Sequence, residues 1–492
     1  MRRSDVLFAR LASLYFLGGG GALFLLSEIS FGSANAAFLA IFAIYYLYGV
    51  SFPGLLYFLA RRNLGRAQES PSPETVHPGI TVAIPAFNEG DVITTCIDSL
   101  LEQERPVERI VVVNDGSSDD TLAVLKRRYK LAVAHRPGAV GADPAVRSLY
   151  QSARVPSLWV IDKANGGKAR ALNSALALTE SAVFTTADAD TYFMPDALSA
   201  IGRHLAADPE VVAAGGVISA ANGAEPKALM GGATALPRGL IAKFQAIEYA
   251  INFVWRFGWQ QLNASLLLSG SFTAFRTEIL RTVGGFDPES LTEDYEISYR
   301  LHTHCRLQGR PYRVVTVPDA VAYTLVPETL SGLLEQRTRW FQGFLQTLVR
   351  YRWAVGRGRF GWLGNFALPV KVFDALAPAW GLAAYGLLVH SLISGSFPVS
   401  LQLLFAVLAF RWLSDVVQSW FLLSLNHHRI APRLGRGQYA VLMALMPINV
   451  WFQRTLWFAY GLKAYYRVLW QVRRWDRRRG EGRRPLGRGA VL

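Results

Sequence analysis

The chain has 492 residues, of which 51% are hydrophobic, and it has a mean hydropathy of +0.21 and a formal net charge of +15. This composition is too apolar for a purely soluble protein and predicts a membrane protein of more than one domain. The positive charge does not indicate a nucleic-acid partner, because the arginines gather beside apolar runs and from Arg467 to Arg488, as at cytoplasmic membrane faces. With only Cys96 and Cys305, neither a disulfide framework nor a cysteine metal site is expected, and a reducing compartment is favoured.

Two apolar stretches lie near the start of the chain, at Leu11–Leu26 and Ala36–Ala60. Each approaches or exceeds the roughly 20 residues that a membrane span needs. Basic residues flank the pair on both sides, so the positive-inside rule predicts a hairpin with both ends in the cytoplasm. We therefore predict two N-terminal transmembrane helices in residues 1–66. A cleaved signal peptide is an alternative for the first stretch, although no convincing small-residue cleavage site follows it.

Residues 67–328 have the pattern of a cytoplasmic α/β domain, in which short β-branched runs alternate with helical stretches. The predicted strands are residues 80–86, 108–116, 158–164 and 182–190, and the predicted helices are Asp91–Gln103, Asp120–Tyr129 and Lys168–Leu178. This order predicts a Rossmann-like, mostly parallel sheet covered by helices, with ligands beyond the carboxyl ends of the strands. The stretch His135–Pro156 is rich in Gly, Ala and Pro and is expected to be a loop insertion.

Polar motifs follow three of these strands. Asp115 in VVNDGSSDD could accept hydrogen bonds from a base or ribose, or could serve only in turn and N-cap chemistry. Lys168 in NGGKARALN could face a phosphate together with backbone N–H groups, or lie at a solvated helix start. Asp188 and Asp190 in ADAD could share a divalent cation with a substrate diphosphate, although such acidic pairs also occur by chance in loops.

The stretch LTEDYEISYRL places Glu293 and Asp294 at the start of a helix whose Ile297 and Leu301 share one face. A carboxylate in this position can simply interact favourably with the helix dipole. As the third acidic site after two that point to phosphate binding, it is also a candidate general base for an acceptor hydroxyl.

The stretch QRTRW occupies residues 336–340, after a run of leucines with helical spacing. We predict an amphipathic interface helix within residues 329–360 that runs along the membrane surface. Arg337 and Arg339 could bind phosphate bidentately or contact lipid headgroups. Trp340 could stack on a pyranose ring or be an ordinary membrane-interface tryptophan.

Three further apolar clusters are predicted to form transmembrane or interfacial helices in residues 361–470. The first two, at residues 366–393 and 397–425, are joined by an uncharged connection and should form a membrane hairpin. The last, at residues 439–469, contains internal basic residues and is expected to be interfacial or re-entrant, with a single span as the alternative. Residues 471–492 are predicted to be a basic cytoplasmic tail.

The order of the motifs, first Asp, then DxD, then ED and finally QxxRW between predicted membrane segments, resembles the processive family-2 glycosyltransferases. These are the membrane synthases of cellulose, hyaluronan, chitin and poly-N-acetylglucosamine. The resemblance covers roughly residues 78–350 in motifs and the whole chain in membrane layout. It implies a GT-A fold inserted between transmembrane helices, in a multi-pass protein of the inner (plasma) membrane.

By this resemblance, the chain would be an inverting hexosyltransferase that passes sugar from a UDP-sugar, with UDP-N-acetylglucosamine favoured, to a growing β-linked polysaccharide and translocates it. The implied catalytic residues are Asp294, Glu293, Arg339 and Trp340, and the implied nucleotide-binding residues are Asp115, Lys168, Asp188, Asp190, Gln336 and Arg337. Asp190 and Asp188 would hold Mg²⁺ or Mn²⁺, and the acceptor would rest on Gly270, Ser271 and Trp340.

Two alternatives and several partners stay open. The chain could be a non-processive transferase that adds one sugar to a membrane lipid, or a membrane receptor or scaffold that binds nucleotide sugars without turnover. The expected partners are the UDP-sugar, a polysaccharide or glycolipid acceptor and membrane lipids. A small membrane subunit is an additional possible partner, and no nucleic-acid partner is expected.

Overall fold

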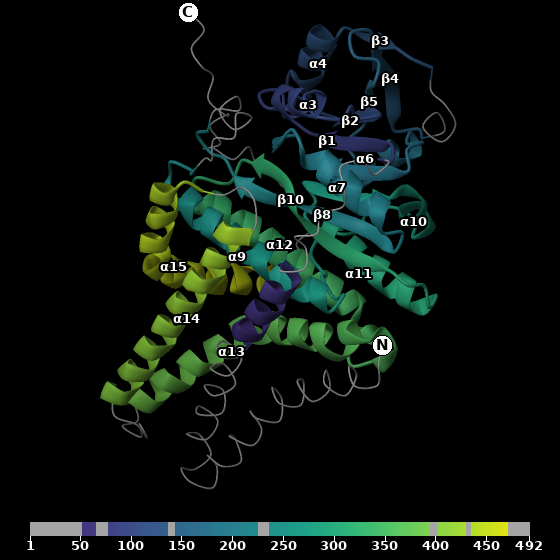
Figure 1. Ribbon diagram of the computed structural model, residues 1–492. Coiled ribbons are helices and arrows are strands. Elements are labelled where there is room, and N and C mark those ends of the chain that lie inside the picture. Colours follow the sequence, from purple (N-terminus) through teal and green to yellow (C-terminus); the bar gives the residue numbers. More distant parts are fainter. Residues whose placement is uncertain are drawn as a thin grey trace, which may run out of the picture.

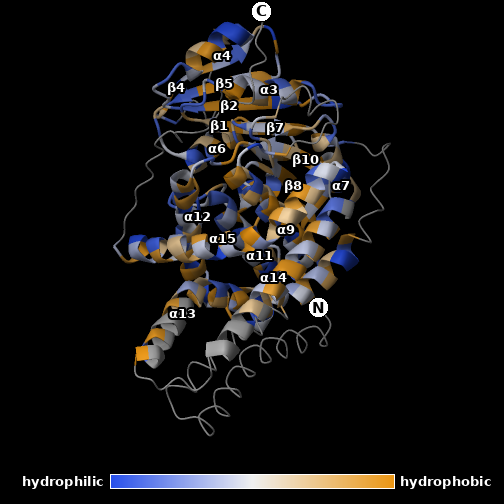
Figure 2. Ribbon diagram, turned by 90° about the vertical axis from the view of Figure 1, so that its left-hand side faces the viewer, coloured by the Kyte–Doolittle hydropathy of each residue, from blue (hydrophilic) through white to orange (hydrophobic). Residues whose placement is uncertain are grey.

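The computed structural model describes residues 52–64, 77–135, 143–224, 236–393, 401–429 and 434–470. Its upper part is a ten-stranded sheet flanked by helices, and its lower part is a group of long helices (Figure 1). Figure 2 shows hydrophobic residues along the central strands and along α9, where the two parts meet. The functional side chains described below lie at this junction.

The strands are β1 (Ile80–Ala86), β2 (Arg109–Asp115), β3 (Leu131–Val133), β4 (Val146–Ser152), β5 (Leu158–Lys163), β6 (Val183–Ala187), β7 (Thr191–Phe193), β8 (Val211–Ala220), β9 (Phe272–Arg276) and β10 (Arg313–Thr324). The helices of the sheet domain are α3 (Ile93–Leu101), α4 (Thr121–Tyr129), α6 (Lys168–Ala177), α7 (Ala197–Ala207), α10 (Thr277–Thr282) and α11 (Glu293–Leu307). The long helices are α9 (Leu240–Gln261), α12 (Leu330–Arg350), α13 (Leu368–Ile393), α14 (Leu401–Arg429) and α15 (Arg436–Leu469).

The centre of the sheet is a parallel block of β5, β2, β1 and β6, which coincide with the four predicted strands. Side chains alternate between two hydrophobic cores, so that Val82 and Ile84 face the core under α3, α4 and α7. Ala83 faces the opposite core, under α6, α10 and α11. Because both faces are buried, these strands are apolar throughout, and their carboxyl ends meet at one edge, as predicted.

Outside this block the sheet is mixed. Strand β9 lies between β6 and β8 and is antiparallel to both, and β7 pairs antiparallel with β10. At the other edge β4 pairs antiparallel with β3 and β5. The prediction of a mostly parallel sheet is therefore correct for the central block and wrong for the sheet as a whole.

The predicted loop insertion at His135–Pro156 is wrong over β4. All the glycines of this stretch and all its prolines except Pro156 precede residue 146, whereas the VRSLYQS segment that follows pairs with β3 and β5 and buries Val146, Leu149 and Tyr150. Composition averaged over the whole stretch concealed this short strand.

The long helices pack against one another beneath the sheet. Ile247 of α9 shares a core with Val416 of α14 and Met446 of α15. Helix α15 is continuous through Pro447, so the last apolar cluster forms one helix.

Within the described ranges, no helix combines the length and the apolarity that crossing a membrane requires. The first predicted span, residues 36–51 of the second and the basic tail lie outside the described residues. The predicted membrane hairpins and the domain boundaries that depend on them stay predictions.

Candidate active site

A single large cavity of about 2870 Å³ contains all the predicted site residues. It begins at the carboxyl ends of the central strands, runs between α9 and α12, and reaches side chains of α13, α14 and α15. The predicted residues that line it are Asp115, Lys168, Asp188, Asp190, Gly270, Ser271, Glu293, Asp294, Gln336, Arg337, Arg339 and Trp340. Motifs separated by more than two hundred residues in the sequence are thus brought to one place.

Asp115, the last residue of β2, is almost fully buried and fixes the loop that leads into α6. Its carboxylate accepts hydrogen bonds from Lys163 Nζ at 2.9 Å, from the Gly166 N–H at 2.9 Å and from the Gly167 N–H at 2.7 Å. Gly167 has a φ of +86°, which the absence of a Cβ makes accessible. Asp115 therefore shapes the start of α6, and its contact with a nucleotide base stays a prediction.

Lys168 is the first residue of α6 and joins three elements of the site. Its Nζ lies 2.6 Å from Asp188 Oδ1, at the end of β6, and 3.1 Å from Glu293 Oε1, at the start of α11. Burial lowers the pKa of Lys168, but the negative charges of Asp188, Glu293 and Asp294 outweigh it and raise the pKa above its ordinary value. The ammonium is therefore a fixed positive charge among carboxylates, and the alternative of a merely solvated helix start is wrong.

Asp188 and Asp190 follow β6 and provide two carboxylates at the cavity wall. Asp188 pairs with Lys168, and Asp190 Oδ1 accepts a hydrogen bond from Thr324 Oγ1 at 3.2 Å. In the described part of the chain, no group of three or more His, Cys, Asp or Glu side chains could hold a metal ion. Two carboxylates nevertheless fit Mg²⁺ or Mn²⁺, because such ions take their remaining ligands from substrate phosphates and water.

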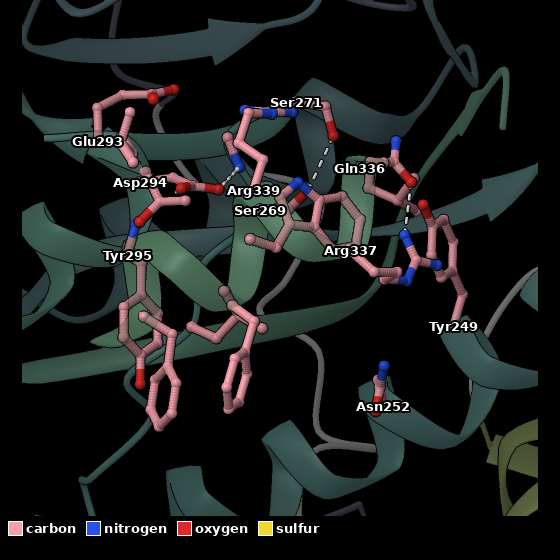
Figure 3. A pocket seen from close by; sticks show the side chains of 18 of the residues that line it. Tyr249, Asn252, Ser269, Ser271, Glu293, Asp294, Tyr295, Gln336, Arg337 and Arg339 are labelled. Carbon is pink, nitrogen blue, oxygen red and sulfur yellow. Dashed lines mark hydrogen bonds between the residues drawn. The ribbon is translucent and has the colours of Figure 1, made fainter. Parts of the chain in front are cut away.

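Asp294 has the surroundings of a general base. Its Oδ1 accepts the Tyr295 N–H at 2.8 Å, and its Oδ2 accepts the Gly270 N–H at 3.0 Å (Figure 3). Burial and the neighbouring Glu293 charge raise the pKa of Asp294 to about 6, against the opposing effects of Lys168 and the two backbone N–H groups. A carboxylate with this pKa is ionised at neutral pH and still basic enough to take a proton from a hydroxyl.

The loop of Ser269, Gly270 and Ser271 comes close to this carboxylate because it contains a glycine. A Cβ on Gly270 would lie 3.0 Å from Asp294 Oδ2 and 3.1 Å from Lys168 Nζ, so any larger residue would displace one of them. The hydroxyls of Ser269 and Ser271 lie 2.8 Å apart and hold the loop in shape before β9 begins.

The QRTRW stretch lies on α12, and the prediction that it is helical is confirmed. Thr329 caps the helix by accepting the Gly332 N–H at 3.2 Å. The Arg337 guanidinium is buried, lies 2.7 Å from Glu248 Oε2 of α9 and donates to Gln336 Oε1 at 2.5 Å. A guanidinium held in this way does not reach lipid headgroups, so that alternative for Arg337 is wrong.

Arg339 and Trp340 lie on the cavity side of the same helix. The Trp340 ring is 37% exposed, and the Arg337 guanidinium lies 4.2 Å from its centroid, which fixes the ring in place. Figure 3 shows the side chains of Arg339, Ser271 and Asp294 directed into the same pocket.

One wall of the cavity was missed by the sequence predictions. Helix α9 presents Glu248, Asn252 and Arg256 to the cavity, and these residues recur at every fourth position. Figure 3 shows Asn252 on this helix, facing the pocket. That spacing of polar residues on a mostly apolar helix was a readable signal, because residues four apart share one helical face.

Comparisons with known proteins identify the family and fold. A family model described as glycosyltransferase-like family 2 matches residues 77–343, more than half of the chain. A poly-β-1,6-N-acetyl-D-glucosamine synthase of Staphylococcus epidermidis is 27% identical over 308 residues, 61% of this chain and 61% of that protein. The synthase of the same name from Staphylococcus aureus strain MSSA476 is 29% identical over 279 residues, 55% of this chain and 56% of that one. The chain thus spans less than two thirds of the length of these relatives.

Among solved structures, a mannosyltransferase from Pyrobaculum calidifontis in complex with GDP-Man and Mn²⁺ superposes with a TM-score of 0.55. The superposition covers 89% of this chain and 99% of the mannosyltransferase at 21% sequence identity, so the likeness is one of fold. The prediction of a GT-A-like α/β domain is confirmed.

Proposed function

Because the chain belongs to the glycosyltransferase-like family 2 and is therefore a glycosyltransferase, we propose that it transfers N-acetylglucosamine from UDP-N-acetylglucosamine to a growing β-linked polysaccharide. The observation that carries this proposal is one cavity in which Asp294, whose pKa is raised to about 6, lies near two carboxylates that could hold a divalent cation for a diphosphate. The alternative of a receptor or scaffold without turnover is discarded, since the family is one of transferases.

The proposed donor site lies at the carboxyl ends of the central strands. It contains the carboxylates of Asp188 and Asp190 and the ammonium of Lys168, and the carboxylates of Glu293 and Asp294 lie beside it at the start of α11. This excess of negative charge would repel a diphosphate, so a donor is expected to enter with a divalent cation. Asp190 and Asp188 would hold Mg²⁺ or Mn²⁺, which when bound supplies positive charge for the leaving diphosphate.

In the proposed reaction, an acceptor hydroxyl attacks the anomeric carbon of the donor sugar and its proton passes to Asp294. The bond between that carbon and the β-phosphate oxygen breaks, and its electron pair leaves with UDP. Lys168 and Arg339 line the same cavity and would stabilise the negative charge that develops on the diphosphate. Attack from the face opposite the leaving group inverts the α-linked donor to a β-linkage.

The choice of sugar rests on the relatives rather than on the geometry. The similar staphylococcal proteins are named as poly-β-1,6-N-acetyl-D-glucosamine synthases, which supports N-acetylglucosamine for this chain. Because these relatives are less than 30% identical to this chain, a β-1,6 linkage in its product is only proposed.

A polymeric acceptor is supported by the extent of the cavity. Past Trp340 it continues to Asp374 of α13, Arg411 of α14 and Asn449 of α15. This length offers room for several sugar units beyond the one that reacts. The runner-up, transfer of a single sugar to a membrane lipid, would use the same donor site. Analysis of the product distinguishes it from polymer synthesis.

We also propose that the protein lies in the inner (plasma) membrane as a multi-pass protein with its sheet domain in the cytoplasm. Large apolar side chains are exposed on the long helices, among them Ile393 at 81%, Trp451 at 65% and Leu469 at 80%. Exposed apolar groups in such numbers favour a lipid or protein partner. The two apolar stretches of residues 1–66 support the same location. A small membrane subunit stays an open proposal.

Product analysis tests the proposed function. The full chain in detergent would be incubated with Mg²⁺ or Mn²⁺ and each of several radiolabelled UDP-sugars, and the products would be separated by size. We expect a ladder of long chains from UDP-N-acetylglucosamine alone. A product that stops at one lipid-linked sugar would establish the runner-up, and the absence of transfer from every UDP-sugar would refute both.

A further inference from the structure

Arg256 lies on the cavity face of α9 and is the last residue of the polar row that starts at Glu248. Within this row, Glu248 is bound to Arg337, which ties α9 to α12. Among the described residues, no such ion pair joins Arg256 to another helix.

The guanidinium of Arg256 has an unsatisfied donor among the described residues. Its Nε is buried without a hydrogen bond, and no carboxylate in the described part of the chain lies within ion-pair distance of it. Its charge lies over the Phe253 ring, whose centroid is 4.3 Å away. Buried polar groups in folded proteins are nearly always hydrogen-bonded, so a set of unused donors beside a cavity indicates a ligand.

Other residues that line the cavity also carry buried donors without a hydrogen bond among the described residues. They are the indole Nε1 of Trp255 and the hydroxyls of Ser265 and Thr292. Each is buried, and each belongs to a residue that lines the cavity. A sugar chain matches this set, because it carries many oxygen acceptors and apolar ring faces that can lie against tryptophan.

Arg256 is also electrostatically coupled to the proposed base. Burial lowers the pKa of Arg256 to about 10, and Asp294 is the carboxylate that most opposes this shift. Arg256 therefore remains charged at neutral pH. Both side chains line the same cavity, where an acceptor sugar could contact both.

We propose that Arg256 is an acceptor-binding residue, which donates hydrogen bonds to oxygen atoms of the terminal acceptor sugar and so holds its attacking hydroxyl against Asp294. This inference rests on the proposed function. The planar guanidinium suits the task, because it donates two parallel hydrogen bonds, for example to an N-acetyl carbonyl oxygen and a neighbouring hydroxyl.

The test compares Arg256→Gln and Arg256→Lys with the wild-type full chain in detergent. Three quantities would be measured: the KM for a short β-linked N-acetylglucosamine oligomer at saturating donor, the Kd of UDP, and the rate of donor hydrolysis without acceptor. Arg313→Gln is a matched control, since Arg313 is 54% exposed at the start of β10, outside the cavity.

For Arg256→Gln we expect the acceptor KM to rise roughly tenfold to a hundredfold, the range expected for loss of a charged hydrogen bond. The Lys variant should fall between Gln and wild type, and the Kd of UDP and donor hydrolysis should stay within about twofold, as an acceptor-side role requires. Unchanged UDP binding would also show that the variant is folded.

If the wild type elongates the oligomer and Arg256→Gln has the same acceptor KM as the wild type, this inference is overturned and the proposed function stands. A parallel loss of UDP affinity would overturn it too, because Arg256 would then act on the donor or on the fold. A wild type that elongates no oligomer would remove the proposed function and this inference together.

Discussion

The replacement Asp294→Asn is the most informative perturbation of the proposed chemistry. The amide has the size of the carboxylate, and its oxygen can accept one of the two backbone N–H groups that Asp294 now binds, from Tyr295 or Gly270. The amide cannot take a proton from the acceptor. General-base catalysis contributes about 10²- to 10⁴-fold, so kcat/KM should fall by this factor, about 3–5 kcal/mol of transition-state stabilisation.

The pH dependence of the wild type gives the same prediction a second readout. The pKa of Asp294 is raised to about 6, mainly by burial, so the base is ionised above this value and protonated below it. We expect kcat/KM to be nearly constant above about pH 7 and to fall tenfold per pH unit below the pKa. The residual activity of Asp294→Asn should lack this acid limb.

The assay would measure release of UDP from UDP-N-acetylglucosamine with a coupled enzyme, between pH 5 and pH 8, with UDP affinity determined by calorimetry. UDP affinity should be nearly intact in Asp294→Asn, because Asp294 lies on the acceptor side of the donor charges. Wild-type turnover in the variant, or an acid limb that survives in it, would refute the assignment of Asp294 as the base.

Three further changes have defined outcomes. Gly270→Ala places a Cβ 3.0 Å from Asp294 Oδ2, so kcat should fall at least about tenfold with UDP affinity unchanged, and unaltered kinetics would contradict the packing. Glu248→Gln leaves the buried Arg337 with a weaker partner, and thermal or denaturant unfolding should show a loss of about 2 kcal/mol, whereas an unchanged midpoint would show that the pair adds no stability. Chelation with EDTA should abolish transfer, and Mg²⁺ or Mn²⁺ should restore it; full activity in EDTA would exclude the metal at Asp190 and Asp188.

The central strands could be predicted from the sequence because burial on both faces makes them continuous apolar runs. Strand β8 could not, since its Gly215 and Gly216 are unusual in a strand. The structure explains why residue 216 is a glycine, because a Cβ there would lie 2.1 Å from the Phe272 ring of the adjacent β9. Such pairing between distant segments leaves no local pattern, and the antiparallel position of β9 was therefore not predictable.

The members of the site could be predicted, but not their partners. Asp115, Asp188 and Asp294 were recognised because polar residues at strand ends and helix starts converge at one edge of such a sheet. The partner of Asp115, Lys163, is 48 residues away in the sequence, and that of Arg337 is 89 residues away. Such contacts depend on tertiary packing. They explain why Arg337, for which a lipid-headgroup contact was one prediction, is instead buried and joins two helices.

The size and anomeric configuration of the product test the proposed function most directly. The wild-type chain would be supplied with UDP-N-acetylglucosamine and a divalent cation, and the purified product would be examined by NMR and size separation. We predict a chain of many N-acetylglucosamine units joined by β-linkages. An α-linkage would contradict the inverting mechanism at Asp294, and a single sugar on a lipid would contradict the polymerising function.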